Sequence, residues 1–260
     1  MDIVVCVKRV PLTEEVDIII DDKKKGIKQD QLAFVLNDWD NYAVEEAILL
    51  KEKYGGTVTA ITVGNEDDEE VLRRSLAMGA DKAIRVEAGD LSRFDSLSIA
   101  KILSATLKDL QYDLALTGVL ADDDNSGAVG IMLAELLNLN HCAMVTAIDI
   151  KDGKANTTSE LEGGLGEVSL IDLPALLTIQ TGINEPRYVS ILGIRKAAKK
   201  ELKVIGLEEL GVSEEELTPK TIIEEAYLPP ETEGAQILSG DPDKIASDFV
   251  EILKKKGVME

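Results

Sequence analysis

Aromatic residues and positive charge are both scarce in this sequence of 260 residues. Phe, Trp and Tyr together make up 3 per cent of it, and 49 acidic against 28 basic side chains leave a formal net charge of −21. Proteins that bind nucleic acids stack bases on aromatic rings and attract phosphates with basic surfaces. We therefore expect no nucleic acid partner, and we expect most acidic side chains to lie on solvated helix faces.

Cysteine and histidine are almost absent. Cys6 and Cys142 lie in apolar runs and form no CxxC pair, which predicts buried thiols and neither a disulfide nor a metal site. The single histidine, His141, has no neighbouring nucleophile or acid, and we expect it in an exposed loop at the end of a helix. Because no triad, metal-ligand cluster or paired-carboxylate pattern occurs, no catalytic residue is predicted.

Long hydrophobic runs are missing as well. No stretch approaches the roughly 20 apolar residues that a membrane-spanning helix needs, so we expect no transmembrane segment. Residues 1–8 have the pattern of a strand rather than of a signal peptide, which favours a cytoplasmic protein. With 45 per cent hydrophobic residues and a mean hydropathy of +0.01, the chain is expected to be soluble, with one sizeable core and an appendage.

What the sequence does contain is an alternation of two patterns. Short apolar runs, typical of strands that are buried on both faces, occur at residues 3–7, 58–63, 83–86, 114–117 and 144–148. Apolar residues at helical spacing lie between them. This alternation predicts an α/β fold of Rossmann-like type, with a mostly parallel sheet and helices on both of its faces.

The pattern changes after residue 150. Asp152-Gly153 and Gly163-Gly164 interrupt runs rich in Thr, Val and Leu, which predicts an added β-hairpin and a further strand between residues 150 and 179. We therefore divide the chain into a domain of residues 1–200 and a C-terminal arm of residues 201–260. The acid-rich segment 208–216 and the Pro-rich segment 229–234 are predicted to be extended linker.

A final amphipathic helix is predicted to begin near Gly240-Asp241-Pro242, with Ile245, Phe249, Ile252 and Leu253 on one face. That face needs a cover. The helix could fold back on its own domain or embrace a partner subunit, and the pattern alone leaves both alternatives open.

Ligands of a parallel sheet bind at the carboxyl ends of its strands, so the loops at residues 6–11, 63–65 and 118–130 are the candidates. In the last of these, small residues from Ser126 to Gly130 open a helix, whose free N–H groups could hold a phosphate. The loop is neither a Walker A motif nor a GxGxxG motif. An ordinary surface turn, with Asp123 or Asp124 as helix N-cap, is therefore an equal alternative.

Residues 184–200 combine a proline-pinned turn, a short apolar ridge and a cationic helical end in an otherwise acidic protein. This combination suggests a docking loop. The alternative is that Ile191, Leu192 and Ile194 simply pack inward. On the docking hypothesis, Lys196, Lys199 and Lys200 would steer acidic partner surfaces.

Four motifs together resemble the β subunit of the electron transfer flavoproteins: AVEEA at 43–47, SLAMGAD at 75–81, EGGL at 162–165, and NEPRY followed by VSILGIRKAAKK at 184–200. The order and spacing agree along roughly the first two hundred residues. The resemblance implies an adenine nucleotide site with these members: Cys6, Lys8, Asn37, Asp38, Trp39, Asp40, Val63, Gly118, Val119, Leu120, Ala121, Asp123, Asp124, Asn125, Ser126, Gly127, Ala128 and Val129.

The same resemblance implies an α subunit as obligate partner, which this family's β subunit embraces with its C-terminal arm, and an FAD shared with that subunit. The nucleotide in the β subunit would be AMP or a second FAD, and NADH is the donor in members that bifurcate electrons. Val119-Leu120 stand where many members have Lys-Gln, which removes a cation and leaves AMP or FAD open. The Lys8 loop and Val119-Leu120 are somewhat more similar to the FAD-binding group.

Ile191 would be the anchor that inserts into an acyl-CoA dehydrogenase or another flavin dehydrogenase, with Lys196 beside it.

Two other classes of protein compete with the electron transfer flavoprotein hypothesis. A stand-alone nucleotide-binding regulator of the universal-stress type has a similar sheet but lacks residues 184–200 and the arm. An ATP-dependent ligase of the pyrophosphatase type would need an SGGxDS-like loop after the first strand, where Pro11-Leu12-Thr13 stands.

Overall fold

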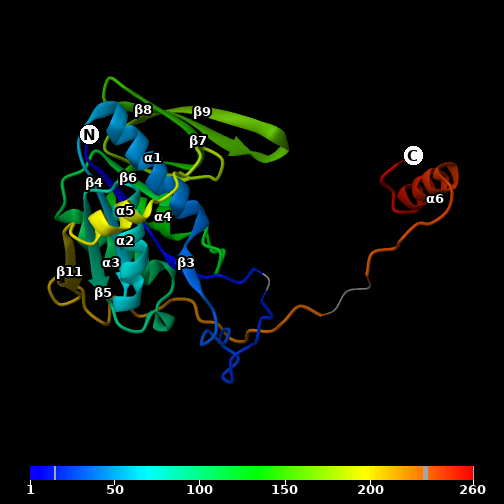
Figure 1. Ribbon diagram of the computed structural model, residues 1–260, viewed down its shortest axis with the longest axis horizontal. Helices are drawn as coiled ribbons and strands as arrows, with labels where there is room; N and C mark the ends of the chain where they lie inside the picture. The colour runs from blue at the N-terminus through cyan, green and yellow to red at the C-terminus, as the bar shows by residue number, and fades with distance from the viewer. Residues whose placement is uncertain (15, 231–233, 260) are drawn as a thin grey trace.

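The computed structural model describes residues 1–14, 16–230 and 234–259 and contains a nine-stranded sheet (Figure 1). The strand order is β11-β5-β4-β1-β6-β10-β7-β8-β9, and every pair from β11 to β7 is parallel. The strands are β1 (Ile3–Cys6), β4 (Val58–Gly64), β5 (Lys82–Glu87), β6 (Leu114–Gly118), β7 (Asn140–Lys151), β8 (Lys154–Leu161), β9 (Leu165–Asp172), β10 (Ala175–Ile179) and β11 (Leu202–Gly206). The mostly parallel α/β sheet predicted from the sequence is confirmed.

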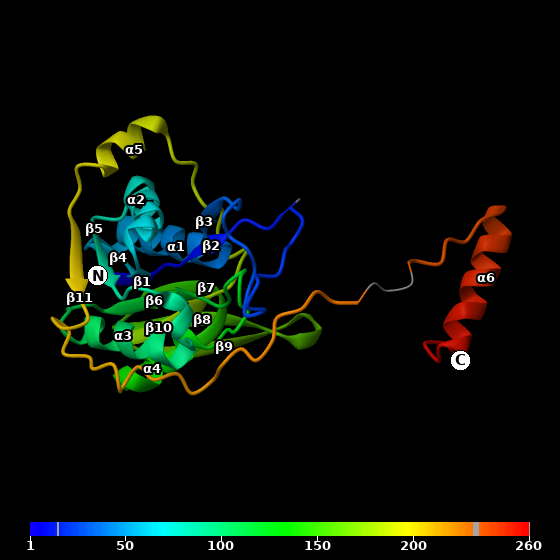
Figure 2. The same ribbon diagram turned by 90° about the horizontal axis from the view of Figure 1, so that it is seen from below.

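Helices cover both faces of this sheet (Figure 2). On one face α1 (Asp38–Tyr54) and α2 (Glu69–Met78) pack on Ile3 and Val5, and on the other α3 (Ser96–Lys108) and α4 (Val129–Leu137) pack on Val4 and Cys6. Successive residues of a strand point to opposite faces, so β1 must be apolar at every position. This explains why the apolar runs of β1, β4, β5 and β6 were a reliable signal. The run at 144–148 lies in β7, where only Val145 of these residues is buried, so its predicted burial on both faces is wrong. Short 3-10 helices lie at Glu66–Asp68, Leu91–Arg93 and Glu162–Gly164.

Beyond β7 the sheet becomes antiparallel. Strands β7, β8 and β9 form a meander, as the glycine-punctuated sequence predicted. The first turn uses Asp152 and Gly153 with φ of 52° and 73°, the left-handed backbone that a tight hairpin turn needs. His141 is exposed as expected, but it lies in β7 rather than in a loop, because β7 begins at Asn140, after a turn of only two residues from the end of α4.

Two short strands, β2 (Arg9–Pro11) and β3 (Phe34–Leu36), form a separate antiparallel pair beside α1. The chain between them includes a small hairpin that is closed by a bridge between Ile20 and Ile27. Residues 223–226 of the C-terminal arm contact this hairpin. Lys25 Nζ donates to the carbonyl of Ile223 at 2.7 Å, and the N–H of Ala226 donates to the carbonyl of Lys24.

After residue 200 the chain first returns to the body. Strand β11 pairs with β5 at the sheet edge, and residues 207–217 form turns against α3 with Leu217 only 2 per cent exposed. The prediction of extended linker at 208–216 is therefore wrong there, because an apolar side chain just after the acidic run is buried and holds the run on the body. Asp95, the N-cap of α3, then accepts the backbone N–H groups of Lys220 and Thr221.

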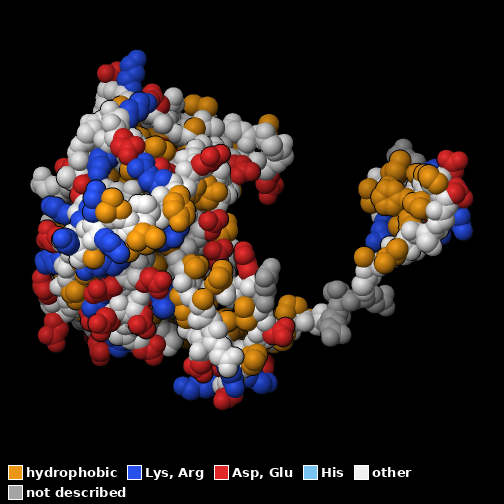
Figure 3. Space-filling view, in the orientation of Figure 1, with side chains coloured by type: hydrophobic (Ala, Val, Ile, Leu, Met, Phe, Trp, Pro, Cys, Tyr) orange, Lys and Arg blue, Asp and Glu red, His pale blue; other side chains and the backbone are white. Residues whose placement is uncertain are grey.

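The last helix, α6 (Pro242–Lys255), lies apart from the body in both views (Figures 1 and 2). It begins as predicted, with Asp241 as N-cap and Pro242 in its first turn. Its hydrophobic side chains gather on one side, which no other part of the described chain covers (Figure 3). The alternative in which this helix folds back on its own domain is not observed. None of the described helices has the length and apolar character that crossing a membrane requires.

Candidate functional site

The centre of the sheet is a topological switch point. From β1 the chain proceeds to β4 and β5 on one side, then crosses to β6 and later β10 on the other, so β1 and β6 are neighbours from which the strand order runs in opposite directions. Ligands of open α/β sheets bind in the crevice at such a point, beyond the carboxyl ends of the strands. The loops that follow β1 and β6 carry most of the residues predicted for the nucleotide site.

Asp40 joins these two loops. Its Oδ2 accepts the backbone N–H of Lys8 at 2.8 Å, and its Oδ1 accepts that of Gly118 at 3.0 Å. The side chain is buried, and burial raises the pKa of Asp40 to about 7 against the opposing effect of these hydrogen bonds. Gly118 has to be a glycine, because a Cβ there would lie 2.5 Å from Asp40 Oδ1. The loops are therefore held together at one buried carboxyl group.

Asn37, which precedes α1, shapes the same region. Its side-chain Nδ2 donates to the carbonyl of Leu120 at 2.8 Å, and its Oδ1 accepts the N–H of Asp122 at 3.1 Å. Asn37 is fully buried. The side chains of Asn37 and Asp40, predicted from the resemblance to surround an adenosine, thus form hydrogen bonds to the loop after β6, a role that the sequence did not indicate.

The capping role predicted for Asp123 or Asp124 is wrong. Helix α4 begins at Val129, and its N-cap Ala128 makes no side-chain capping bond. Both aspartates instead pair with Lys8, whose Nζ lies 2.6 Å from Asp123 Oδ1 and 2.9 Å from Asp124 Oδ2. Burial by itself would lower the pKa of Lys8, and the two carboxylates more than offset this and raise it. The two aspartates thus pair with a lysine of another loop instead of capping α4.

The first turn of α4 therefore faces the loop without a side-chain cap, and the positive end of the helix dipole points there. The helix lies close to the sheet at this end. A Cβ on Gly130 would be 2.5 Å from Thr117 Oγ1 and 2.7 Å from Thr178 Cγ2. Gly127 has φ of +59°, a left-handed backbone that glycine adopts without strain. Backbone N–H groups at the start of α4 and the side chain of Lys8 are thus the groups at this edge that could bind an anion.

Cys6 lies at the end of β1 beneath these loops. Burial, together with the nearby Asp40, raises the pKa of its thiol to about 12. The thiol is neutral at physiological pH and is no nucleophile. Val63, at the end of β4, is half-buried on the other side of β1. The structure therefore brings Cys6, Val63 and the loop after β6 to one edge of the sheet, where Cys6 contributes packing.

Trp39, the only tryptophan of the chain, is half-buried in the first turn of α1. Its Nε1 donates to Gln180 Oε1 at 2.9 Å, and Gln180 Nε2 donates to Glu160 Oε2 at 3.0 Å. These bonds connect the start of α1, at the carboxyl ends of the strands, to the end of β8. Sequence reasoning missed Gln180, which belongs to no motif and follows a buried strand without any distinctive spacing.

The charge of this edge is predominantly negative. Asp123 and Asp124 flank Lys8, and Asp122 lies near Asp38, where burial and this neighbour raise the pKa of the Asp38 carboxyl. Two surface hollows lie elsewhere, one beside the 20–27 hairpin and one at the opposite edge of the sheet. In the described part of the chain, no cluster of His, Cys, Asp and Glu is arranged to hold a metal ion.

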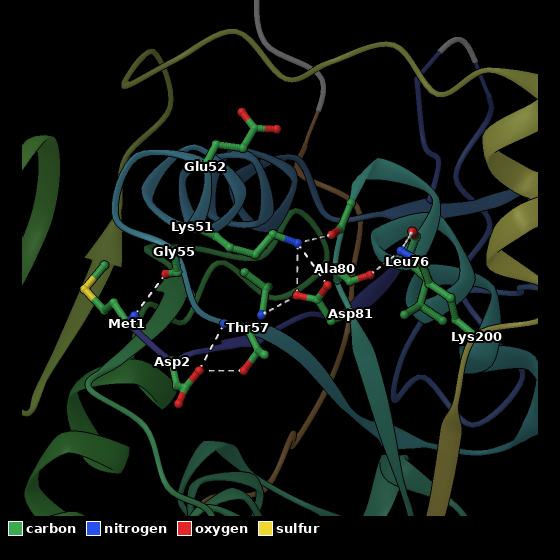
Figure 4. Close-up of polar contacts among 12 residues, drawn as sticks. Met1, Asp2, Lys51, Glu52, Gly55, Thr57, Leu76, Ala80, Asp81 and Lys200 are labelled. Carbon is green, nitrogen blue, oxygen red and sulfur yellow. Dashed lines mark hydrogen bonds and ion pairs between the residues drawn. The ribbon is translucent and has the colours of Figure 1, made fainter.

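The predicted docking segment forms α5 (Ile191–Ala197), which lies on the outer side of α2 (Figure 2). Ile191, Leu192 and Ile194 are 71, 62 and 55 per cent exposed, so the alternative in which they pack inward is not observed. Lys196 and Lys199 are exposed beside them. Lys200, predicted as a third steering cation, is half-buried, and its Nζ donates to the carbonyls of Leu76 and Ala80 (Figure 4).

The chain before α5 is held on α1. Arg187 makes a bidentate ion pair with Glu45, which is only 3 per cent exposed, and a second pair with Glu52. Asn184 Nδ2 donates to Glu46 Oε2 and to the carbonyl of Tyr42. The motifs at 43–47, 75–81 and 184–200, which are far apart in the sequence, thus meet in one region of the fold.

Comparison of the sequence with known proteins shows what the chain is similar to. The family model described as "Electron transfer flavoprotein domain" matches residues 26–210. The electron transfer flavoprotein subunit beta of Bacillus subtilis is 41 per cent identical over 257 residues, which cover 98 per cent of both chains. The subunit beta of Homo sapiens is 33 per cent identical over 98 per cent of this chain and 97 per cent of its own. The caffeyl-CoA reductase-Etf complex subunit CarD of Acetobacterium woodii is 32 per cent identical over both full lengths.

Proposed function

The chain belongs to the electron transfer flavoprotein family as a β subunit, and from this premise we propose that it holds a low-charge adenine nucleotide, AMP or FAD, at the β1–β6 switch point. Family membership implies association with FAD, which accepts and releases electrons when bound, and pairing with an α subunit. It also excludes the universal-stress alternative, because the similarity continues through residues 184–200 and the arm.

The observation that carries the nucleotide proposal is the loop after β6. Asn37 and Asp40 form hydrogen bonds with its backbone, and the loop leads into the uncapped start of α4. Backbone N–H groups at a helix start bind phosphate oxygens without requiring a cationic side chain. This suits a chain in which Val119 and Leu120 stand where a cation is usual, and Lys8 remains as the one lysine at the edge.

Charge limits which nucleotide fits. Asp123 and Asp124 beside Lys8, and the adjacent Asp38 and Asp122, repel further negative charge, so a nucleotide with two phosphate charges is favoured over a triphosphate with four. AMP and FAD both satisfy this limit. Val119 and Leu120 are half-buried and would offer an apolar wall to an isoalloxazine ring, which is the observation that favours FAD and, with it, electron bifurcation from NADH as the second candidate function.

The nucleotide content of the heterodimer decides between them. We expect the co-expressed α and β chains to elute as one yellow complex, and acid extraction followed by chromatography to release an adenine compound in addition to one FAD. Two FAD per heterodimer would support bifurcation, and one FAD with one AMP would support the simpler carrier. Release of ATP, or of no adenine compound from the β chain, would contradict the proposal.

We further infer that the α subunit covers the arm and α6. The arm exposes Ile222, Ile223, Tyr227 and Ile237 by 63 to 88 per cent, and α6 presents its apolar face to no other part of the described chain. An isolated helix of 14 residues is marginal in water, so a partner that buries this face stabilises it. A cytoplasmic location remains a prediction from the sequence.

We propose that α5 is the segment that docks on a dehydrogenase for electron exchange. We propose that Ile191 is the docking anchor and that Lys196 and Lys199 guide acidic partner surfaces, because the three apolar side chains of α5 are exposed and basic residues surround them. A small apolar contact suits a carrier, since the complex must dissociate after every transfer. An acyl-CoA dehydrogenase or another flavin dehydrogenase is the proposed partner class.

A further inference from the structure

Helix α5 displays its side chains instead of burying them. Of its seven residues only Ala197 is buried, whereas Ile191, Leu192 and Ile194 are more than half exposed. A helix of this length is not stable by itself in water, because its few hydrogen bonds do not offset the entropy of ordering it. Apart from the packing of the buried Ala197, its position must therefore depend on contacts that these exposed apolar side chains do not make.

Those contacts are reciprocal caps between α5 and α2. Arg73, on α2, donates from Nη1 to the carbonyls of Ala197 and Lys200 at 3.2 Å each. Lys200, just after α5, donates from Nζ to the carbonyls of Leu76 and Ala80 at 3.0 and 2.6 Å (Figure 4). The C-terminal end of a helix carries partial negative charge, so each helix end receives a cation from the other segment.

The two helices also approach closely between these caps. A Cβ on Gly193 would lie 3.2 Å from the carbonyl oxygen of Ala77, so a larger residue there would push α5 away from α2. At the start of α5, Ser190 Oγ accepts the N–H of Gly193 at 3.1 Å. The helix is thus fixed at both ends and in its middle by polar or backbone contacts.

Lys51 supports the same turn from α1. Its Nζ donates to the carbonyl of Gly79 at 2.9 Å and to both oxygens of Asp81 at 3.0 Å (Figure 4). Asp81 Oδ2 also accepts the N–H of Val58 at the start of β4. The turn that receives Lys200 is therefore itself anchored to the sheet, and it provides a rigid base for the cap.

We propose that Arg73 and Lys200 are positioning residues for partner docking, which fix α5 on α2 so that Ile191 is presented in one place without either residue needing to touch the partner. This inference rests on the proposed docking role of Ile191. A preordered surface loses less entropy on association, so loosening α5 should slow productive docking while the apolar anchor itself stays intact.

Adjacent arginines of α2 provide matched variants. Arg73→Gln removes the cap, and Arg74→Gln removes the same charge from an exposed neighbour one residue away. Arg73→Lys keeps a cation that can reach the same carbonyls. All variants are to be studied as the αβ heterodimer, with flavin content and melting temperature as checks that the fold is retained.

Hydrogen exchange tests the cap without any dehydrogenase. We expect the amides of residues 194–198 to exchange about tenfold faster in Arg73→Gln, the effect of losing a charge-assisted hydrogen bond, and at the wild-type rate in Arg74→Gln. Equal exchange in Arg73→Gln and wild type would overturn the inference, whatever the docking role of Ile191.

Electron exchange tests the consequence, with an acyl-CoA dehydrogenase reduced by butyryl-CoA as the probe. Arg73→Gln should lower the second-order rate about tenfold, with Arg73→Lys and Arg74→Gln near wild type. Ile191→Ala combined with Arg73→Gln should be no slower than Ile191→Ala alone, because both act on one contact. Multiplied losses, or an unaffected Arg73→Gln beside a slow Ile191→Ala, would refute positioning. A wild-type rate for Ile191→Ala would instead remove the docking premise.

Discussion

Single residues decide the geometry of the proposed nucleotide edge, and Asp40 and Asn37 shape loops to which they do not belong. Asp40 belongs to α1, yet its two oxygens fix the backbones of Lys8 and Gly118. A buried carboxylate is costly unless it is hydrogen-bonded, and here both oxygens are. Asp40 therefore holds the two loops together while its burial raises its pKa well above the ordinary value.

This titration predicts a pH dependence of stability. The pKa of Asp40 is about 7 in the folded protein against an ordinary value of 3.8, so between these values the folded state binds a proton that the unfolded state has released. Stability contributed by Asp40 is therefore full below pH 4 and is lost as the pH rises towards 7, by up to about 4 kcal/mol. Asp40→Asn cannot titrate.

Urea unfolding at pH 5, 6, 7 and 8 measures this effect. The difference in unfolding free energy between wild type and Asp40→Asn should favour the wild type most at pH 5 and shrink as the pH rises. Asp243→Asn is the control, because Asp243 is exposed on α6, far from the two loops in the chain order. Parallel curves for wild type and Asp40→Asn would contradict the assignment.

Lys8 predicts an effect on binding rather than on stability. Its ion pairs with Asp123 and Asp124 are partly exposed, so Lys8→Gln should cost no more than about 1 kcal/mol of folding free energy. The same change leaves two uncompensated carboxylates beside the proposed phosphate position, and we expect AMP to bind about tenfold more weakly at low salt. Fluorescence of Trp39, the only tryptophan, measures this binding. Lys28→Gln, on the distant hairpin, should bind AMP as the wild type does.

At the scale of elements, the position of α4 depends on a glycine. The backbone of Gly130 lies against the side chains of Thr117 on β6 and Thr178 on β10, and a Cβ would approach them to 2.5 and 2.7 Å. The uncapped start of α4 can face the switch point because the helix is this close to the sheet.

Gly130→Ala is therefore expected to move α4 outward and to destabilise the protein by about 1–3 kcal/mol, as overpacking in a filled core does. Thermal unfolding measures the loss, and nucleotide retention should fall with it. Gly153→Ala offers a contrast, since open space surrounds that turn and only its positive φ opposes the substitution. Equal stability of Gly130→Ala and wild type would show that the helix can adjust freely.

The strands could be predicted from the sequence because burial on both faces imposes an apolar residue at every position, as Ile3, Val4, Val5 and Cys6 show. Side-chain pairs across the fold could not. The pairing of Lys8 with Asp123 spans 115 residues, and a nearby helix start wrongly suggested a cap. Composition likewise predicted a linker at 208–216, where the burial of Leu217 holds the chain on α3. Contacts that depend on tertiary packing leave no local pattern.

For the whole molecule, the important division is between a body that folds around one sheet and an arm that leaves it. The arm lies along the body up to the hairpin at residues 20–27, where Lys25 and Lys24 hold it, and α6 follows at a distance. The first part of the arm belongs to the body, since Ile205 and Leu217 are buried in its core, but in the described chain no buried core residue lies beyond Leu217.

Removal of residues 229–260 should consequently leave the melting temperature of the isolated β chain within a few degrees of the full chain. The same truncation should abolish stable co-elution with the α subunit, because it removes the apolar face of α6. Size-exclusion chromatography of the mixed chains measures this. Gln236→Ala, an exposed change within the arm, serves as the control. A truncated chain that still co-elutes would place the main contact on the body instead.

The exposed tail has a consequence for the life of the protein in the cell. A newly made β chain that has not met an α subunit exposes the apolar side chains of this arm to proteases and to association with other copies. We expect β chains without an α subunit to be degraded faster than paired ones. This would keep the amounts of the two chains equal without a separate control of their synthesis.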